Sequence, residues 1–227
     1  MGFGSATPID SVDWMLLTIG HLSANRFWGE TERVRKPLCT TSLLRTSAGL
    51  VVVDPGVEPE RMPQLLHDQA GLRPEDVAFV FMTHSHADHR YGLEAFPHAT
   101  WLMSAAEIAY WRSRSERDDG RVLEHLQAVD HEPFPGVRAV ATPGHTPGTT
   151  SLLFAWRGRT IALVGDAVMT EAHFIARSGH TNSVDEDLAR TSIDWLGREA
   201  DMIVPGHANA FVVGWAHNGA SRSTVSG

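Results

Sequence analysis

The chain has 227 residues, of which 42% are hydrophobic and 20% are charged, a composition that suits a folded protein with its own core and excludes a disordered chain. Its 19 basic and 27 acidic residues give a formal net charge of -8. This balance argues against a nucleic-acid partner, because binding to phosphates draws on clustered lysine and arginine. The single cysteine, Cys39, excludes an internal disulfide and a cysteine-based zinc site.

Location and domain count follow from other features of the whole chain. The N-terminus lacks the basic start and apolar run of a signal peptide, and no apolar stretch approaches the ~20 residues that span a bilayer. Together with the lone thiol, these features favour a cytoplasmic protein with no membrane partner. Since no repeat or linker interrupts the composition, we expect one domain over residues 1–227, with a frayed C-terminus after about residue 218. The sequence leaves open whether the chain forms a homodimer.

Strand-like and helix-like segments alternate in the first part of the chain. Strands are expected at residues 38–45 and 50–53, and the second ends at the turn signal "DPG". Residues 58–69 predict a helix. Residues 77–82 form a short continuous apolar run, which is typical of a strand buried on both faces.

The middle of the chain begins with a helix that we expect over residues 104–117. Ser104 is a good N-cap for this helix, and Glu107 follows at the spacing of a capping box. A turn is expected near Gly120. Strands then follow at residues 137–141, 150–155 and 160–164.

The last part of the chain has a predicted loop over residues 170–183, followed by a helix that begins at Ser183 or Asp185 and reaches Glu199. A short strand at residues 202–204 follows. Because strands and helices alternate and the early strands are apolar, the expected class is α/β, with sheets that helices cover.

Side chains that can bind metal ions follow directly after these apolar strands. Asp54 follows "LVVV", and the motif "THSHADH", which starts at Thr83, follows "VAFVFM". His145 lies in "TPGHTPG", Asp166 in "LVGDA" and His207 in "VPGH". Strand ends at one edge of a sheet converge in space, so we expect these side chains to form one site.

The donor set favours cations of the first transition row, since imidazole binds them well and a carboxylate can bridge two of them. A merely polar turn is disfavoured because the same residue types recur at other strand ends. A metal-free acid/base site is disfavoured because crowded imidazoles repel one another when protonated. One arrangement gives one cation His84, His86 and His145, a second cation Asp88, His89 and His207, and a bridging role to Asp166. Two such cations can hold a bridging hydroxide for attack on a carbonyl.

The motifs together resemble those of the metallo-β-lactamase superfamily. "VVVDPG", "THSHADH", "TPGHTPG", "VGDA" and "VPGH" occur in the family's order within residues 38–207, and their combination is specific. The resemblance implies a four-layer αββα sandwich with the metal site at one edge of both sheets. It also implies the dinuclear ligand set above, with Asp54 orienting a ligand histidine. The simpler interpretation of Asp54 is a turn former.

The resemblance and the acidic charge favour a dinuclear metal-dependent hydrolase that cleaves an ester-like bond of a small molecule: a lactone, a thioester or a small carboxyl ester. The nucleophile would be a metal-bridging hydroxide. Zinc is the first candidate for both cations, with iron and manganese as alternatives. Asp88 or Asp166 would relay the proton, and Tyr91, directly after the metal loop, could reach the substrate.

Three other functions stay open at this point. They are an oxidoreductase similar to persulfide dioxygenases with one iron, a phosphodiesterase or nuclease, and a non-catalytic metal sensor. Lactonases of acyl-homoserine lactones usually supply a tyrosine near the bridging aspartate, whereas the tyrosines here are Tyr91 and Tyr110. Four further residues belong either to ordinary packing and solvated loops or to the wall of a substrate pocket: Phe27, Trp28, His173 and His180.

Overall fold

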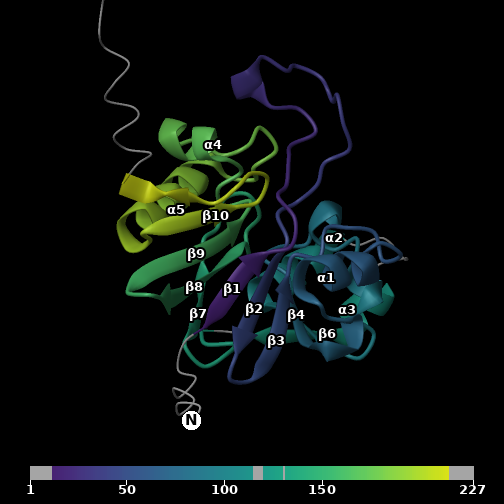
Figure 1. Ribbon diagram of the computed structural model, residues 1–227. Coiled ribbons are helices and arrows are strands. Elements are labelled where there is room, and N and C mark those ends of the chain that lie inside the picture. The colour runs from purple at the N-terminus through teal and green to yellow at the C-terminus, as the bar shows by residue number, and fades with distance from the viewer. Residues whose placement is uncertain (1–11, 115–119, 130, 215–227) are drawn as a thin grey trace, which may run out of the picture.

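Two β-sheets face one another in the structure of this chain, a computed structural model that describes residues 12–114, 120–129 and 131–214 (Figure 1). Within these residues, the first sheet has the strand order β1-β2-β3-β4-β5-β6. Its strands are β1 (Asp13–Leu16), β2 (Ser42–Thr46), β3 (Gly49–Val53), β4 (Val77–Phe81), β5 (Thr100–Ser104) and β6 (Leu126–Val129). The second sheet has the order β11-β10-β9-β8-β7. Its strands are β7 (Val137–Ala141), β8 (Thr150–Trp156), β9 (Arg159–Gly165), β10 (Met202–Pro205) and β11 (Phe211–Val212).

The direction of the strands decides which loops meet. β3, β4, β5 and β6 run parallel to one another, while β2 and β3 form an antiparallel pair in which Ser42 faces Val53. In the second sheet, β9 and β10 are parallel and β8 is antiparallel to both of its neighbours. Because β3 and β4 are parallel, and β9 and β10 are parallel, the loops after the two strands of each pair leave from the same edge of the sheet. This carboxyl edge is where α/β sheets carry their sites.

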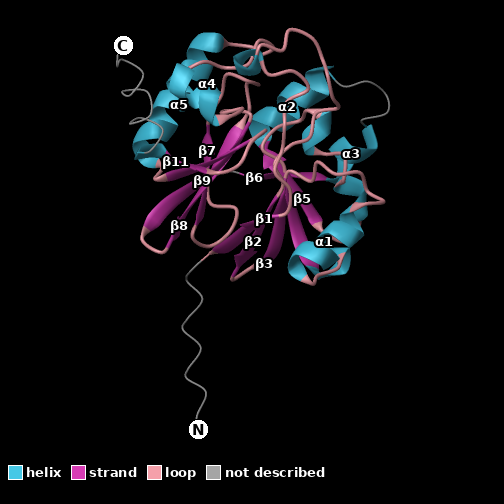
Figure 2. Ribbon diagram, turned by 45° about the horizontal axis from the view of Figure 1, so that its top comes forward, coloured by secondary structure: helices cyan, strands magenta, loops and turns pink. Residues whose placement is uncertain are grey.

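Helices cover the outer face of each sheet (Figure 2). α1 (Met62–Ala70), α2 (Ala105–Arg114) and α3 (Gly120–His125) contribute to a core with the first sheet. α4 (Glu171–Ala176) and α5 (Glu186–Glu199) contribute to a core with the second sheet. The predicted α/β class and its four-layer αββα arrangement are confirmed.

Apolar side chains fill three layers. Phe81 of the first sheet and Leu152 of the second belong to the cluster between the sheets, and both are fully buried. Leu66 of α1 belongs to the cluster between the first sheet and its helices, and Ile193 of α5 belongs to the cluster between the second sheet and its helices. Each such side chain contributes about 1.5–3 kcal/mol by leaving water, so the packed layers provide a rigid base for the loops at the strand ends.

Several predicted elements need correction. The residues after Gly120 form α3 rather than a turn, and the expected loop over residues 170–183 contains α4. α4 forms because the Thr170 side chain accepts a hydrogen bond from the backbone N–H of His173, a capping signal that sequence reasoning missed. Asp185, and not Ser183, caps α5 by accepting from Leu188 N.

The boundaries of other elements shift by a few residues. α1 begins at Met62 rather than residue 58 and has a proline in its first turn. α2 is described as far as Arg114, so the last part of the helix predicted to residue 117, like the expected fraying after residue 218, lies outside the described residues. The strands β1, β5, β6 and β11 were not expected. Within the described residues, no helix has both the length and the apolar character needed to cross a bilayer.

Candidate metal centre

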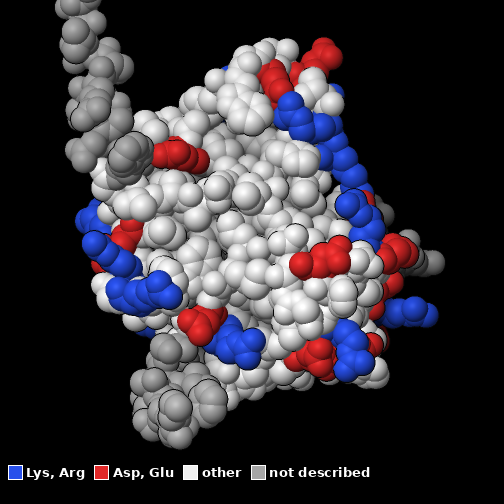
Figure 3. All heavy atoms as spheres, in the orientation of Figure 1, with Lys and Arg blue, Asp and Glu red and all other residues white. Residues whose placement is uncertain are grey.

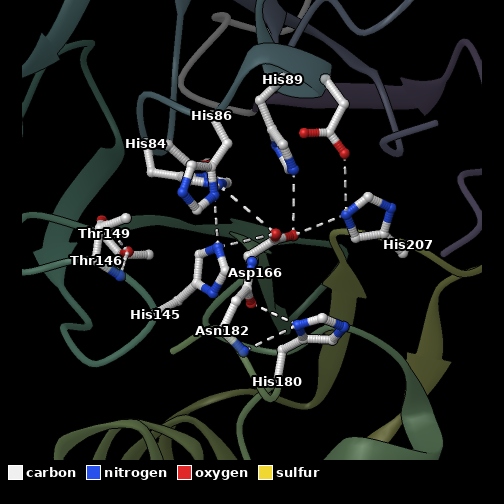
Figure 4. Close-up of polar contacts among 12 residues, drawn as sticks. His84, His86, His89, His145, Thr146, Thr149, Asp166, His180, Asn182 and His207 are labelled. Atoms are coloured by element: carbon white, nitrogen blue, oxygen red, sulfur yellow. Dashed lines mark hydrogen bonds and ion pairs between the residues drawn. The ribbon is translucent and has the colours of Figure 1, made fainter. Parts of the chain in front are cut away.

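The seven predicted ligands meet at the edge of both sheets where β4, β9 and β10 end (Figure 4). Four of them come from the short turn after β4, and the others come one each from the loops after β7, β9 and β10. They are His84, His86, Asp88, His89, His145, Asp166 and His207. The structure divides their donor atoms into two groups.

The first group consists of three imidazoles and one oxygen of Asp166. Nδ1 of His86 lies 3.0 Å from Nε2 of His84 and 2.8 Å from Nε2 of His145. Oδ2 of Asp166 lies 3.2 Å from Nε2 of His145 and 3.6 Å from Nε2 of His84. The four donor atoms therefore surround one point.

The second group lies on the other side of the same carboxylate. Oδ1 of Asp166 lies 3.2 Å from Nε2 of His89 and 3.3 Å from Nε2 of His207. Oδ2 of Asp88 approaches the same His207 nitrogen at 3.6 Å. One oxygen of Asp166 thus faces each group, which is the arrangement of a carboxylate that bridges two cations.

The spacing within both groups fits a metal ion. For bonds of about 2.0–2.1 Å, the corners of a tetrahedron lie about 3.3–3.4 Å apart. The donor pairs named above lie 2.8 to 3.6 Å apart, and all donors within each group lie within 4.8 Å of one another. Among the described residues, Nε2 of His89 and Oδ1 of Asp166 are buried without a hydrogen bond. Buried polar atoms are rarely left unsatisfied, so the residues present fit a pair of cations.

Electrostatics support the same conclusion for the first group. Burial lowers the pKa of His145 to about 3 and holds the pKa of His84 well below its usual value. Burial raises the pKa of Asp166, but the neighbouring imidazoles, with His207 first, outweigh it and hold the pKa well below the usual value. Neutral imidazoles around an ionised carboxylate are the protonation states that metal binding requires.

Asp54 contacts His89, one of the ligands of the second group. Its Oδ2 atom lies 2.9 Å from Nδ1 of His89, and Oδ1 accepts from the backbone N–H of Thr83 at 2.8 Å. His207 has a comparable support, because its Nδ1 lies 2.9 Å from the carbonyl oxygen of Leu38. Contacts of this kind fix the ring so that Nε2 turns toward the metal position.

Comparison with known proteins decides the family. A model described as the metallo-beta-lactamase superfamily matches residues 35–207, well over half of the chain. The chain belongs to the metallo-β-lactamase superfamily.

Individual members of the superfamily are similar over most of the chain. An N-acyl homoserine lactonase of Bacillus cereus is 27% identical over 198 residues, which cover 73% of this chain and 79% of the lactonase. Metallo-beta-lactamase domain-containing protein 1 of Xenopus laevis is 34% identical over 155 residues, 66% of this chain and 61% of that protein. The crystal structure of a quorum-quenching N-acyl homoserine lactone lactonase has a TM-score of 0.66 at 25% identity and covers 86% of this chain and 91% of that one. The predicted class, a metal-dependent hydrolase, is confirmed.

In this metallo-β-lactamase superfamily member, the ring of Tyr91 packs against the side chain of Lys36. The ammonium group of Lys36 lies 4.4 Å from the centroid of the Tyr91 ring. The same ammonium forms an ion pair with Glu58. Among the described residues, no hydrogen bond to the seven predicted ligands comes from Tyr91, so its catalytic role stays a prediction.

The segment around Phe27 and the segment after Asp166 come together beside the metal centre. The guanidinium of Arg26 donates to the Ser178 hydroxyl at 2.6 Å and to the Gly179 carbonyl at 3.0 Å. The Phe27 ring meets the His173 ring edge to face, with 4.8 Å between the centroids. Sequence reasoning left open whether Trp28 is a core residue, and its exposed fraction of 68% shows that it is not.

His173 is a buried imidazole that the prediction of a solvated loop did not anticipate. Its Nδ1 lies 2.9 Å from the Thr170 hydroxyl, while its Nε2 has no hydrogen bond to the described residues. Burial and the charge of Arg26 lower the pKa of His173 to about 3, and the charges of Asp166 and His207 are close enough to contribute. The ring is therefore neutral and retains an unsatisfied nitrogen near the metal centre.

Proposed function

We propose that the chain is a dinuclear metallohydrolase that cleaves a carboxyl ester bond in a small molecule, with a lactone as the first candidate. The observation that carries the proposal is the Asp166 carboxylate, whose two oxygens face two separate groups of donors. Such a carboxylate suits two cations a few ångströms apart better than one.

The roles of the seven residues follow from the two groups. His84, His86 and His145 would hold one cation, and Asp88, His89 and His207 would hold the other, with Asp166 shared. When bound, the two cations would lower the pKa of water and polarise a carbonyl oxygen, which is the chemistry that ester hydrolysis needs. Zinc is the first candidate because imidazole and carboxylate oxygen are among its usual ligands.

The chain's own residues prepare this chemistry. Burial keeps the His84 and His145 rings neutral, so their lone pairs are available. The carboxylate of Asp88 is only partly buried, with 16% of its side chain exposed, so it is the better placed of the two acids to exchange a proton with solvent. Asp166, at 4% exposed, would serve as the bridge.

A small carboxyl ester suits the formal net charge of -8 better than a nucleic acid does. On the face shown in Figure 3, lysine and arginine side chains gather along the margin, and the broad centre carries few charges. The lactonase names of relatives at 27% identity support a lactone substrate.

We also propose that both sheets form one domain, because the core between them is shared.

Chelation tests the proposal. Protein stripped with a chelator and dialysed should lose hydrolysis of a panel of lactones, thioesters and carboxyl esters, and two equivalents of zinc should restore it. Bis-p-nitrophenyl phosphate serves as the competing substrate. Full activity of the stripped protein, or hydrolysis of the phosphodiester alone, would show that the proposal is wrong.

A further inference from the structure

Glu107 of α2 joins the two loops that carry the first group of imidazoles. Its Oε1 atom accepts from the backbone N–H of Ser85 at 2.9 Å and from the Ser85 hydroxyl at 2.7 Å. Its Oε2 atom accepts from the Thr146 hydroxyl at 2.7 Å and from the backbone N–H of Gly148 at 3.1 Å. Ser85 lies between His84 and His86, and Thr146 directly follows His145.

The carboxylate is fully buried, with 0% of the residue exposed. Removing a carboxylate from water is unfavourable unless hydrogen bonds replace the lost hydration, and four donors do so here. All four donors come from the two ligand loops and none from α2 itself. The carboxylate therefore does not serve the helix as the capping box predicted it would, although Ser104 Oγ does accept from Glu107 N at 3.2 Å.

The backbone around Glu107 shows how closely the second loop approaches. A Cβ atom at Gly148 would lie 2.1 Å from the backbone nitrogen of Glu107, so only glycine fits there. Ser104 Oγ also donates to the Gly148 carbonyl at 2.8 Å. The start of α2 thus holds the loop after His145 through its side chains and through direct backbone packing.

We propose that Glu107 is a positioning residue that sets the relative placement of His84, His86 and His145, and so controls binding of the first cation while leaving the second cation's ligands alone. This inference rests on the proposed dinuclear function. The second group has its own support in Asp54, which touches His89 and Thr83. Asp54 contacts a ligand of the second group directly, whereas it reaches His84 of the first group only through the Thr83 hydroxyl, which lies 3.2 Å from Nδ1 of His84.

Glu107→Gln is the decisive variant, because it preserves the shape of the side chain but replaces one acceptor oxygen with an NH₂ group. Whichever oxygen is replaced, two donors on one ligand loop lose their acceptor. We expect the dissociation constant for zinc at the first group to rise about 10–100-fold, the range seen when groups that orient metal ligands are removed. Competition with a chromogenic chelator measures the two constants, and anomalous diffraction from zinc-loaded crystals assigns the loss to one position.

Two variants serve as controls. Asp54→Asn should weaken the second position more than the first, which is the opposite selectivity, because Asp54 contacts His89 directly and His84 only through Thr83. Asp201→Asn removes a carboxylate that accepts from Thr160 N at 2.9 Å near the other end of β9, and both metal positions should stay filled. Thermal unfolding of each variant checks that the protein is folded before metal binding is compared.

Ser85→Ala and Thr146→Val provide a second route if Glu107→Gln does not fold. Each removes one hydroxyl donor to Glu107, and each should raise the dissociation constant at the first position only. Equal loss of zinc from both positions in folded protein, or unchanged binding in every variant, would overturn the role of Glu107. Wild-type protein that binds fewer than two zinc ions would instead refute the dinuclear function.

Discussion

The Nδ1 atom of His89 lies 2.9 Å from the Oδ2 atom of Asp54, and both residues are buried at the carboxyl edge of the first sheet. The carboxylate can only accept, so the imidazole donates from Nδ1, and a cation bound between Nε2 and Asp166 would take the lone pair of Nε2. Asp54 adopts a φ of 51°, in the left-handed region, which aspartate tolerates better than most residues. A residue first considered as a turn former therefore also contacts a candidate ligand.

Asp54→Asn should weaken zinc binding at the second position about 10–100-fold, because an amide can present its NH₂ group to the N–H of His89 and turn the ring away. The catalytic constant should fall together with the zinc occupancy and recover in part when zinc is in excess. Metal titration with activity recorded at each step checks this. If Asp54 is only a turn former, Asp54→Asn should bind both ions normally.

Asp166→Asn should reduce the metal content from two ions to one, since an amide cannot offer two anionic oxygens to two cations. We expect kcat/KM to fall by at least about 100-fold, as both metal positions lose a ligand. Elemental analysis of the purified variant and steady-state kinetics provide the measurements. Two bound ions with wild-type activity would contradict the bridging assignment.

Removal of metal should destabilise the fold as well as stop hydrolysis. A ligand that binds only the folded protein stabilises it by about 4 kcal/mol at a thousandfold excess over its dissociation constant. The crowded imidazoles of the first group, 2.8 to 3.0 Å apart, also lose the cation that would hold them together. Thermal unfolding with and without chelator should show a lower Tm in the stripped protein, and an unchanged Tm would indicate that metal does not bind these residues.

His173→Phe should lower kcat/KM for the preferred substrate about tenfold while both metal ions stay bound. The reason is that Nε2 of His173 is a buried polar atom without a partner among the described residues, and the charges of Asp166 and His207 contribute to the pKa of the ring. A substrate oxygen or nitrogen could satisfy it, and one such hydrogen bond contributes about 0.5–1.5 kcal/mol. Phenylalanine keeps the ring that packs on Phe27.

The measurement for His173 is the separation of KM from kcat across a substrate panel. Phe27→Leu is a matched control, because it changes the apolar neighbour and leaves the imidazole in place. A His173→Phe variant with wild-type kinetics on every active substrate would show that the unsatisfied nitrogen does not contact substrate.

The positions of the candidate ligands were predictable from the sequence, for a local reason. An apolar run followed by a polar turn marks the end of a buried strand, and this pattern occurs before His84 and again before Asp166 and His207. Parallel strands bring such ends to one edge, so the α/β class and the grouping of the ligands followed from short stretches of sequence.

Contacts between distant segments were decided only by the tertiary structure. The spacing of Ser104 and Glu107 correctly predicted the backbone cap, but the carboxylate of Glu107 bonds to residues 22 and 41 positions away. A histidine at position 173 is compatible with either a buried or a solvated side chain, so its residue type alone did not predict its burial. The burial of His173 depends on α4 and on the contact with Phe27, which is distant in the sequence. Local patterns determine where a polar side chain leaves the backbone, whereas its partners depend on which loops pack against it, and only the folded chain brings those loops together.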